Sequence, residues 1–349
     1  MKTLNTYLRP RKLVKEKHIS ILALCATCLA FLVIGLGAYT RLSDSGLGCP
    51  DWPGCYGHIL PSASAAQAYT HSLFNAAKAY AEMIHRYVAA SLALLILCLT
   101  ALCLRKAILT RSLNWYFVSA WLLILLFYQV ALGMLTVSLK LLPIIVTGHL
   151  FGGYLIFASC FSLFLWQWPA KPTISDAKPP LQRYFCYGAI VLLLLQIFLG
   201  AWTSTHYSAL SCKGFPFCHQ NTPMVWDFRD AFHVSFNHHL NYDGGLLSQK
   251  ARATIQMVHR FGALVVFCYI TALMISSLKP IKCTPKLYLA FFYVIIALFI
   301  QLGLGISTVL LERPVLIALL HNYGAALLLL SLIHLCWRMQ TSAKPTHTG

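Results

Sequence analysis

Residues 82–104 read EMIHRYVAASLALLILCLTALCL, and no charged residue follows Arg86 in this stretch. A helix needs about 20 mostly apolar residues to cross the hydrocarbon core of a bilayer, and this run is long enough. Its polar residues Glu82, His85 and Arg86 gather at the N-terminal end. The stretch therefore predicts a transmembrane helix whose ionisable groups lie near one face of the membrane.

Seven further apolar stretches of similar length follow the same pattern. Hydrophobic residues make up 58% of the 349 residues and charged residues only 10%, which excludes a soluble enzyme and a disordered chain. The pattern disfavours a membrane barrel, because its strands would alternate polar and apolar residues rather than run apolar for about 20 residues. The fold class that we predict is all-α, a polytopic membrane protein with eight transmembrane helices in two pseudo-symmetric four-helix bundles. The spans are expected at Ile19–Thr40, Met83–Leu104, Trp115–Ser138, Thr147–Trp168, Tyr184–Thr205, Ile255–Ser277, Leu287–Leu310 and Val315–Trp337.

The charge of the chain predicts its orientation. The formal net charge is +18, from 27 Lys and Arg against 9 Asp and Glu. Most of the basic residues lie before the first span, after the last, or in the connections on that same side, and basic residues collect on the cytoplasmic side of membrane proteins. We therefore expect no nucleic-acid partner, both termini in the cytoplasm, and the long segments Arg41–Glu82 and His206–Thr254 outside.

Five motifs recur in the same order in the two halves of the chain, which indicates an internal duplication. We predict an N-terminal half at 1–170, a C-terminal half at 184–340 and a cytoplasmic linker at 171–183. Each half has an even number of spans, so the repeats share one orientation. The matched motifs are Gly37–Thr40 with Gly200–Thr203, Cys49 and Cys55 with Cys212 and Cys218, Glu82–Arg86 with Gln256–Arg260, Gln129–Gly133 with Gln301–Gly305, and Gly148–Gly152 with Leu320–Gly324.

Four histidines, His85, His149, His259 and His321, lie inside the second and fourth spans of each half. One such histidine would most often form a hydrogen bond at the membrane interface. Two repeated pairs favour metal ligation, since two imidazoles at matching depth can fill both axial positions of a heme iron. Zinc is less apt, because no carboxylate or thiolate recurs with both pairs.

The residues around the histidine pairs allow two interpretations each. Arg86 and Arg260 follow the outer histidine of each half and are suited either to heme propionates or to anchoring at the interface. Gly148, Gly152, Gly153 and Gly324 let either a flat macrocycle or another helix approach closely. Most of the other histidines lie in or beside the outer loops or near the termini, where we expect them to be solvated or interfacial.

Glu82 marks the sharpest difference between the halves. It stands three residues before His85, on the same helical face, and the matching residue of the C-terminal half is Gln256. A carboxylate at this place can accept a proton or stabilise positive charge on an oxidised carbon. The alternative is a solvated acid at a helix N-terminus, stabilised by the helix dipole.

Two pairs of the 13 cysteines lie among glycines and prolines on the predicted outer side, where disulfides persist. These pairs are Cys49 with Cys55 and Cys212 with Cys218. Each pair either closes a small loop or forms a redox-active dithiol that exchanges with a partner.

Taken together, these residues make the chain similar to the heme A synthase family over nearly its whole length. The similarity rests on the Glu-x-x-His-Arg motif at Glu82–Arg86, its Gln-x-x-His-Arg repeat at Gln256–Arg260, His149, His321 and the run Gly-Cys-Pro-Asp-Trp-Pro-x-Cys at Gly48–Cys55. It implies an oxidoreductase that oxidises the C8 methyl group of heme O to the formyl group of heme A, which terminal cytochrome oxidases require.

The resemblance also implies roles for individual residues. His259, His321 and Arg260 would hold a resident b-type heme, and His85, His149 and Arg86 would hold the substrate heme O. Glu82 would be the catalytic carboxylate. Disulfides would join Cys49 to Cys55 and Cys212 to Cys218.

The same resemblance implies where the protein is located and which partners it has. We expect it in the plasma membrane of a bacterium. The partners to expect are heme O synthase, assembly factors of cytochrome oxidase, an unidentified electron carrier and, in a homo-oligomer, a second copy of the chain.

Two other classes of protein compete with this prediction. A di-heme b-type cytochrome would only transfer electrons, but the Glu82 and Gln256 difference argues against two equivalent relay hemes. A transporter built from repeats would show helices broken near the midplane rather than histidines near one face.

Overall fold

The computed structural model describes residues 16–70, 74–167, 181–212, 214–218, 224–234, 237, 240–277 and 285–341. Within these ranges every regular element is a helix. The elements are α1 (Glu16–Leu42), α2 (Ala63–Thr70), α3 (Ala76–Thr110), α4 (Leu113–Ser138), α5 (Pro143–Gln167), α6 (Leu181–Thr205), α7 (Phe228–Ala231), α8 (Gln249–Ser277), α9 (Pro285–Leu310) and α10 (Val315–Thr341).

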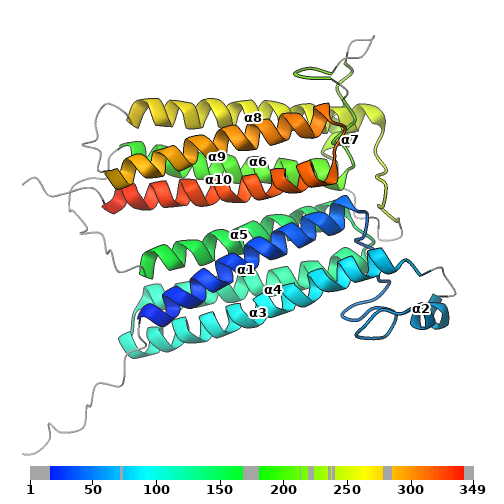
Figure 1. Ribbon diagram of the computed structural model, residues 1–349, viewed down its shortest axis with the longest axis horizontal. Helices are drawn as coiled ribbons and strands as arrows, with labels where there is room; N and C mark the ends of the chain where they lie inside the picture. Colours follow the sequence, from blue (N-terminus) through cyan, green and yellow to red (C-terminus); the bar gives the residue numbers. More distant parts are fainter. Residues whose placement is uncertain are drawn as a thin grey trace, which may run out of the picture.

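Eight of these helices are long and apolar enough to cross a membrane, which confirms the predicted all-α class and the number of spans within the described residues. The short helices α2 and α7 belong to the two long connections and lie at the same end of the bundle (Figure 1). Trp168, the predicted end of the fourth span, and residues 171–180 of the predicted linker lie outside the described residues. The longest helix, α3, begins after Asn75, whose side chain accepts a hydrogen bond from the Lys78 amide at 3.1 Å.

The long helices pack side by side, but their contacts differ between the two halves (Figure 1). In the N-terminal half, α1 packs on α3 and α5, and α4 packs on the same two helices, so the four form a closed ring. In the C-terminal half, α6 packs on α8 and α10, and α9 packs on α10, while α8 and α9 make few contacts. The described part of the C-terminal half is therefore the more open of the two.

The two halves meet along α1, α5, α6 and α10. One continuous apolar core runs through the eight long helices, where van der Waals packing holds the helices together. Polar contacts join the halves as well. The Tyr154 hydroxyl donates to the carbonyl of Asn322 at 2.8 Å, and the Arg41 guanidinium donates to the carbonyl of Ser204 at 2.7 Å.

Candidate functional site

The four predicted histidines lie on α3, α5, α8 and α10, each within about three turns of the N-terminal end of its helix. Successive spans alternate in direction, so the starts of these four helices share one face of the bundle. All four side chains are half-buried. The structure therefore places His85, His149, His259 and His321 at one end of the bundle, as two pairs on alternate spans.

Each histidine ring lies against a glycine of the preceding long helix. A Cβ atom added at that glycine would lie only 2.9–3.2 Å from the imidazole Cε1, closer than almost all real Cβ contacts. Any larger residue would therefore push the ring away. The sequence motifs contained these glycines, but only the structure gives them this role. The pairs are Gly37 with His85, Gly133 with His149, Gly200 with His259, and Gly305 with His321.

The donor set fits heme iron. Among the described residues, no group of three or more His, Cys, Asp or Glu side chains gathers in the way that a closed zinc site needs. Instead there are two imidazoles in each half, and a heme iron needs only two axial ligands because its macrocycle supplies the others. The Nδ1 atoms of His85, His149 and His321 are buried without a hydrogen-bond partner in the described structure.

Glu82 is buried, with 4% of its surface exposed, so the solvated alternative for this residue is wrong. Its Oε2 accepts a hydrogen bond from the Cys49 amide at 2.9 Å, and its Oε1 lies 2.5 Å from the Arg86 guanidinium. Arg86 also donates to the carbonyls of Asp51 and Gly54, at 2.9 and 2.5 Å. The acid and the arginine therefore fasten the first long loop to the helix that carries His85.

Gln256 occupies the matching place in the C-terminal half and is equally buried, with 3% exposed. Its Oε1 accepts from the Cys212 amide at 2.6 Å, and its Nε2 donates to the Ala209 carbonyl at 2.5 Å. Arg260 donates to loop carbonyls, among them those of Cys212 and Gly214 at 3.0 and 2.9 Å. The two halves thus build the same scaffold around an acid in one case and an amide in the other. The predicted roles of the two arginines toward heme propionates stay predictions.

Both predicted cysteine pairs are disulfides. Cys49 bonds to Cys55 and Cys212 to Cys218, and each bridge closes a loop with a sequence separation of 6. The first cysteine of each bridge supplies the amide that binds Glu82 or Gln256. The disulfides therefore fix the backbone donors of this site.

Tyr56 extends the polar network of the N-terminal half, and the sequence motifs did not single it out. Its hydroxyl donates to the Gly48 carbonyl at 3.3 Å. Burial raises the pKa of Tyr56, and the negative charges of Glu82 and Asp51 raise the pKa further. The phenol therefore stays protonated at neutral pH and remains a hydrogen-bond donor beside the acid.

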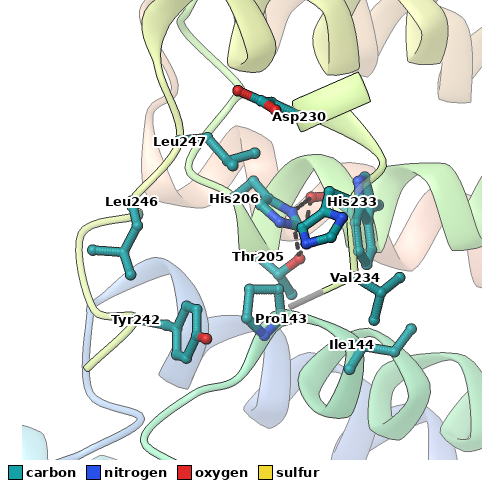
Figure 2. Close-up of a pocket in the computed structure, with 12 residues that line it drawn as sticks. Pro143, Ile144, Thr205, His206, Asp230, His233, Val234, Tyr242, Leu246 and Leu247 are labelled. Atoms are coloured by element: carbon teal, nitrogen blue, oxygen red, sulfur yellow. Dashed lines mark hydrogen bonds between the residues drawn. The ribbon is translucent and has the colours of Figure 1, made fainter. Parts of the chain in front are cut away.

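A small pocket of about 110 Å³ lies near the ends of α5 and α6 (Figure 2). His206 and His233 line it together with Asp230 and Tyr242, whereas none of the four helix histidines does. His206 is 6% exposed, and its Nδ1 lies 3.0 Å from the Trp202 carbonyl oxygen. We expected most of the outer histidines to be solvated or interfacial, but His206 is buried. Burial lowers the pKa of His206, which keeps the ring neutral at pH 7.

Comparisons with known proteins agree with this arrangement. Residues 20–333 match the family COX15-CtaA, described as cytochrome oxidase assembly protein. The chain is 38% identical to the heme A synthase of Shewanella oneidensis over 320 residues, which cover 89% of this chain and 94% of that protein. It is 27% identical to the heme A synthase of Rickettsia massiliae, over 94% of this chain and 100% of that protein. It is 25% identical to the heme A synthase of Bacillus pumilus, over 91% and 94% of the two chains.

Proposed function

This chain belongs to the COX15-CtaA family of cytochrome oxidase assembly proteins, and we propose that it is a heme A synthase, an oxidoreductase that converts heme O to heme A. The single observation that carries the proposal within the structure is the buried Glu82 beside His85, with Gln256 in the matching place beside His259. A protein that only relays electrons between two equivalent hemes has no need of this difference. The specific reaction that we propose is oxidation of the C8 methyl group to a formyl group, acting on a CH, CH₂ or CH₃ group.

The two histidine pairs are proposed to do different work. His259 and His321, with Arg260, would hold a resident b-type heme in the C-terminal half, residues 184–340. His85 and His149, with Arg86, would hold heme O in the N-terminal half, residues 1–170. When bound, the hemes supply the redox chemistry. The glycine contacts of all four rings support heme ligation in both halves, because they set the position of each imidazole against a neighbouring helix.

Glu82 is proposed to act at the methyl carbon. The conversion of a methyl to a formyl group takes its oxygen from one water and releases four electrons and four protons. A buried carboxylate can accept one of these protons or stabilise positive charge that develops on the carbon. The Cys49 amide and Arg86 hold the carboxylate in one orientation, so it needs little rearrangement during the reaction.

The location of the protein is proposed from its charges. The predicted face opposite the histidines carries Lys106, Arg183 and Arg338 at helix ends, which supports both termini in the cytoplasm. The bacterial plasma membrane is proposed from the similarity to bacterial heme A synthases such as that of Shewanella oneidensis. The partners to expect are heme O synthase, assembly factors of cytochrome oxidase and an electron acceptor.

The decisive experiment is heme extraction from cells that make heme O but no heme A. We expect heme A to appear when this chain is expressed in such cells, and not with the empty vector. Purified protein should carry b-type heme together with heme O or heme A. If the cells still make no heme A when this chain is expressed, and the purified protein binds only heme B, the synthase is refuted and an electron-transferring cytochrome is favoured.

A further inference from the structure

Three of the four histidines are followed three residues later by a glycine, and a glutamine of the neighbouring helix packs onto that glycine. A Cβ atom at any of these glycines would overlap the glutamine amide. Each glutamine also stands four residues before the glycine that contacts the histidine ring. The glycines at these places therefore make room for an amide beside the imidazole. The sets are Gln129 and Gly152 at His149, Gln196 and Gly262 at His259, and Gln301 and Gly324 at His321.

In the C-terminal half the amides reach the histidines. The Nε2 of Gln196 lies 3.0 Å from Nδ1 of His259 and also donates to the His259 carbonyl at 2.8 Å. The Nε2 of Gln301 lies 3.4 Å from Nε2 of His321. In the N-terminal half, the Nε2 of Gln129 is buried and has no partner among the described residues, so it does not bond His149.

His85 has no such amide at all. Val33 stands four residues before Gly37, where Gln196 stands four residues before Gly200, and Val88 takes the place of Gly262. Both valines are apolar and cannot bond an imidazole. Within the described structure, the glycine contact from Gly37 remains, but the Nδ1 of His85 has no hydrogen bond.

We propose that Gln196 is a positioning residue that fixes His259 as a permanent axial ligand, and that His85, with no amide beside it, is the exchangeable ligand of the substrate site. This inference rests on the proposed function, since it takes the four histidines as ligands of heme iron. A hydrogen bond to the second ring nitrogen fixes the orientation of a ligating histidine and raises its basicity. A resident heme must stay bound, whereas a substrate heme must enter and its product must leave. A histidine held by a hydrogen bond suits the first case, and a histidine without one suits the second.

An amide suits this role because it offers both a donor and an acceptor. When iron binds Nε2 of His259, Nδ1 must carry the proton and needs an acceptor. The Oε1 atoms of Gln196 and Gln301 are buried and have no partner among the described residues. A half-turn of the Gln196 amide would therefore bring an unused acceptor to the ring, in exchange for the hydrogen bond to the His259 carbonyl.

The first test removes one amide from the heme-loaded, full-length protein. We expect Gln196→Leu to release b-type heme to apomyoglobin about 10- to 100-fold faster than wild type, the usual loss for such a partner. The low-spin electron paramagnetic resonance signal of that heme should also shift. Gln196→Met, which keeps the length of the side chain without its polar atoms, should behave in the same way and replaces the leucine variant if that does not fold.

The second test introduces a glutamine beside His85, where the natural chain has none. The double variant Val33→Gln with Val88→Gly should slow the release of heme O or heme A from the protein about 10- to 100-fold, while b-type heme is released at its ordinary rate. The matched control, Val33→Leu with Val88→Gly, opens the same space without an amide and should release heme as fast as wild type.

The outcomes separate the two proposals. Unchanged heme release and an unchanged resonance signal in both Gln196 variants would overturn the positioning role, even if the wild type makes heme A. If the variant Val33→Gln with Val88→Gly and its control release heme O or heme A at equal rates, the exchangeable role of His85 is overturned. A wild-type protein that makes no heme A would instead refute the proposed function, and the release rate of its b-type heme would still decide the role of Gln196.

Discussion

The N-terminal half holds a carboxylate where the C-terminal half holds an amide, on otherwise matching scaffolds. Glu82 and Gln256 each bind the backbone amide of a disulfide-bonded cysteine, and each stands three residues before a histidine. The support of the histidines differs as well, because among the described residues only the C-terminal pair has hydrogen bonds from glutamine side chains. Under the roles proposed above, two copies of one design differ through a few polar residues, one suited to chemistry and one to holding a heme.

The largest effect that would test this comparison is the loss of a heme. His259→Ala or His321→Ala should remove most of the b-type heme, because each change takes away one of two axial bonds. His85→Ala or His149→Ala should leave that heme bound and lower heme A production instead. Heme content is measured by pyridine hemochrome spectra of the purified variants. If all four variants lose b-type heme equally, the division of work between the halves is wrong.

The next effect concerns the acid itself. Glu82→Gln removes the charge and the basicity but keeps the shape, and Gln256 shows that this scaffold accepts an amide. General-base catalysis contributes typically about 10²–10⁴-fold, so we expect heme A production to fall by a factor of this order. The measurement is the ratio of heme A to heme O in cells with the variant as sole copy. A ratio near that of wild type would make Glu82 a structural residue that fastens the loop.

Much of this arrangement could be predicted from the sequence. The eight spans follow from apolar runs, and the histidine positions follow from the repeat. The sequence could not show that Arg86 turns toward loop carbonyls, since that contact depends on how residues 51–54 fold back over α3. It also left the role of Gly152 and Gly324 undecided between a macrocycle and a helix, and the structure gives that space to Gln129 and Gln301. Spacing marks small residues, but only packing shows which side chain fills the space.

A smaller effect separates the two disulfides. Removing either pair by Cys→Ser changes should lower the free energy of unfolding by about 2 kcal/mol, because each bridge closes a short loop. The change at Cys49 and Cys55 should also lower heme A production, because Cys49 supplies the amide that orients Glu82. The change at Cys212 and Cys218 should lower stability alone. Thermal unfolding in detergent and heme ratios measure the two quantities, and equal activity losses from both changes would contradict the assigned difference.

The smallest effect is expected when the C-terminal half receives an acid. Gln256→Glu loses the hydrogen bond from its Nε2 to the Ala209 carbonyl and sets a carboxylate oxygen against that carbonyl oxygen, a cost of about 1–3 kcal/mol. The acceptor to the Cys212 amide remains, and the buried Nε of Arg260, which has no partner among the described residues, lies on the next helical turn and can pair with the new carboxylate. The pairing with Arg260 should offset part of this cost, so we expect a small loss of thermal stability, with heme content and the ratio of heme A to heme O close to wild type. Gln256→Leu is the matched control, since it removes both hydrogen bonds of the amide, and it should destabilise the protein more than the acid does. A variant Gln256→Glu that loses heme A production while keeping its b-type heme would show that the C-terminal site must stay uncharged for the chemistry in the N-terminal half to proceed.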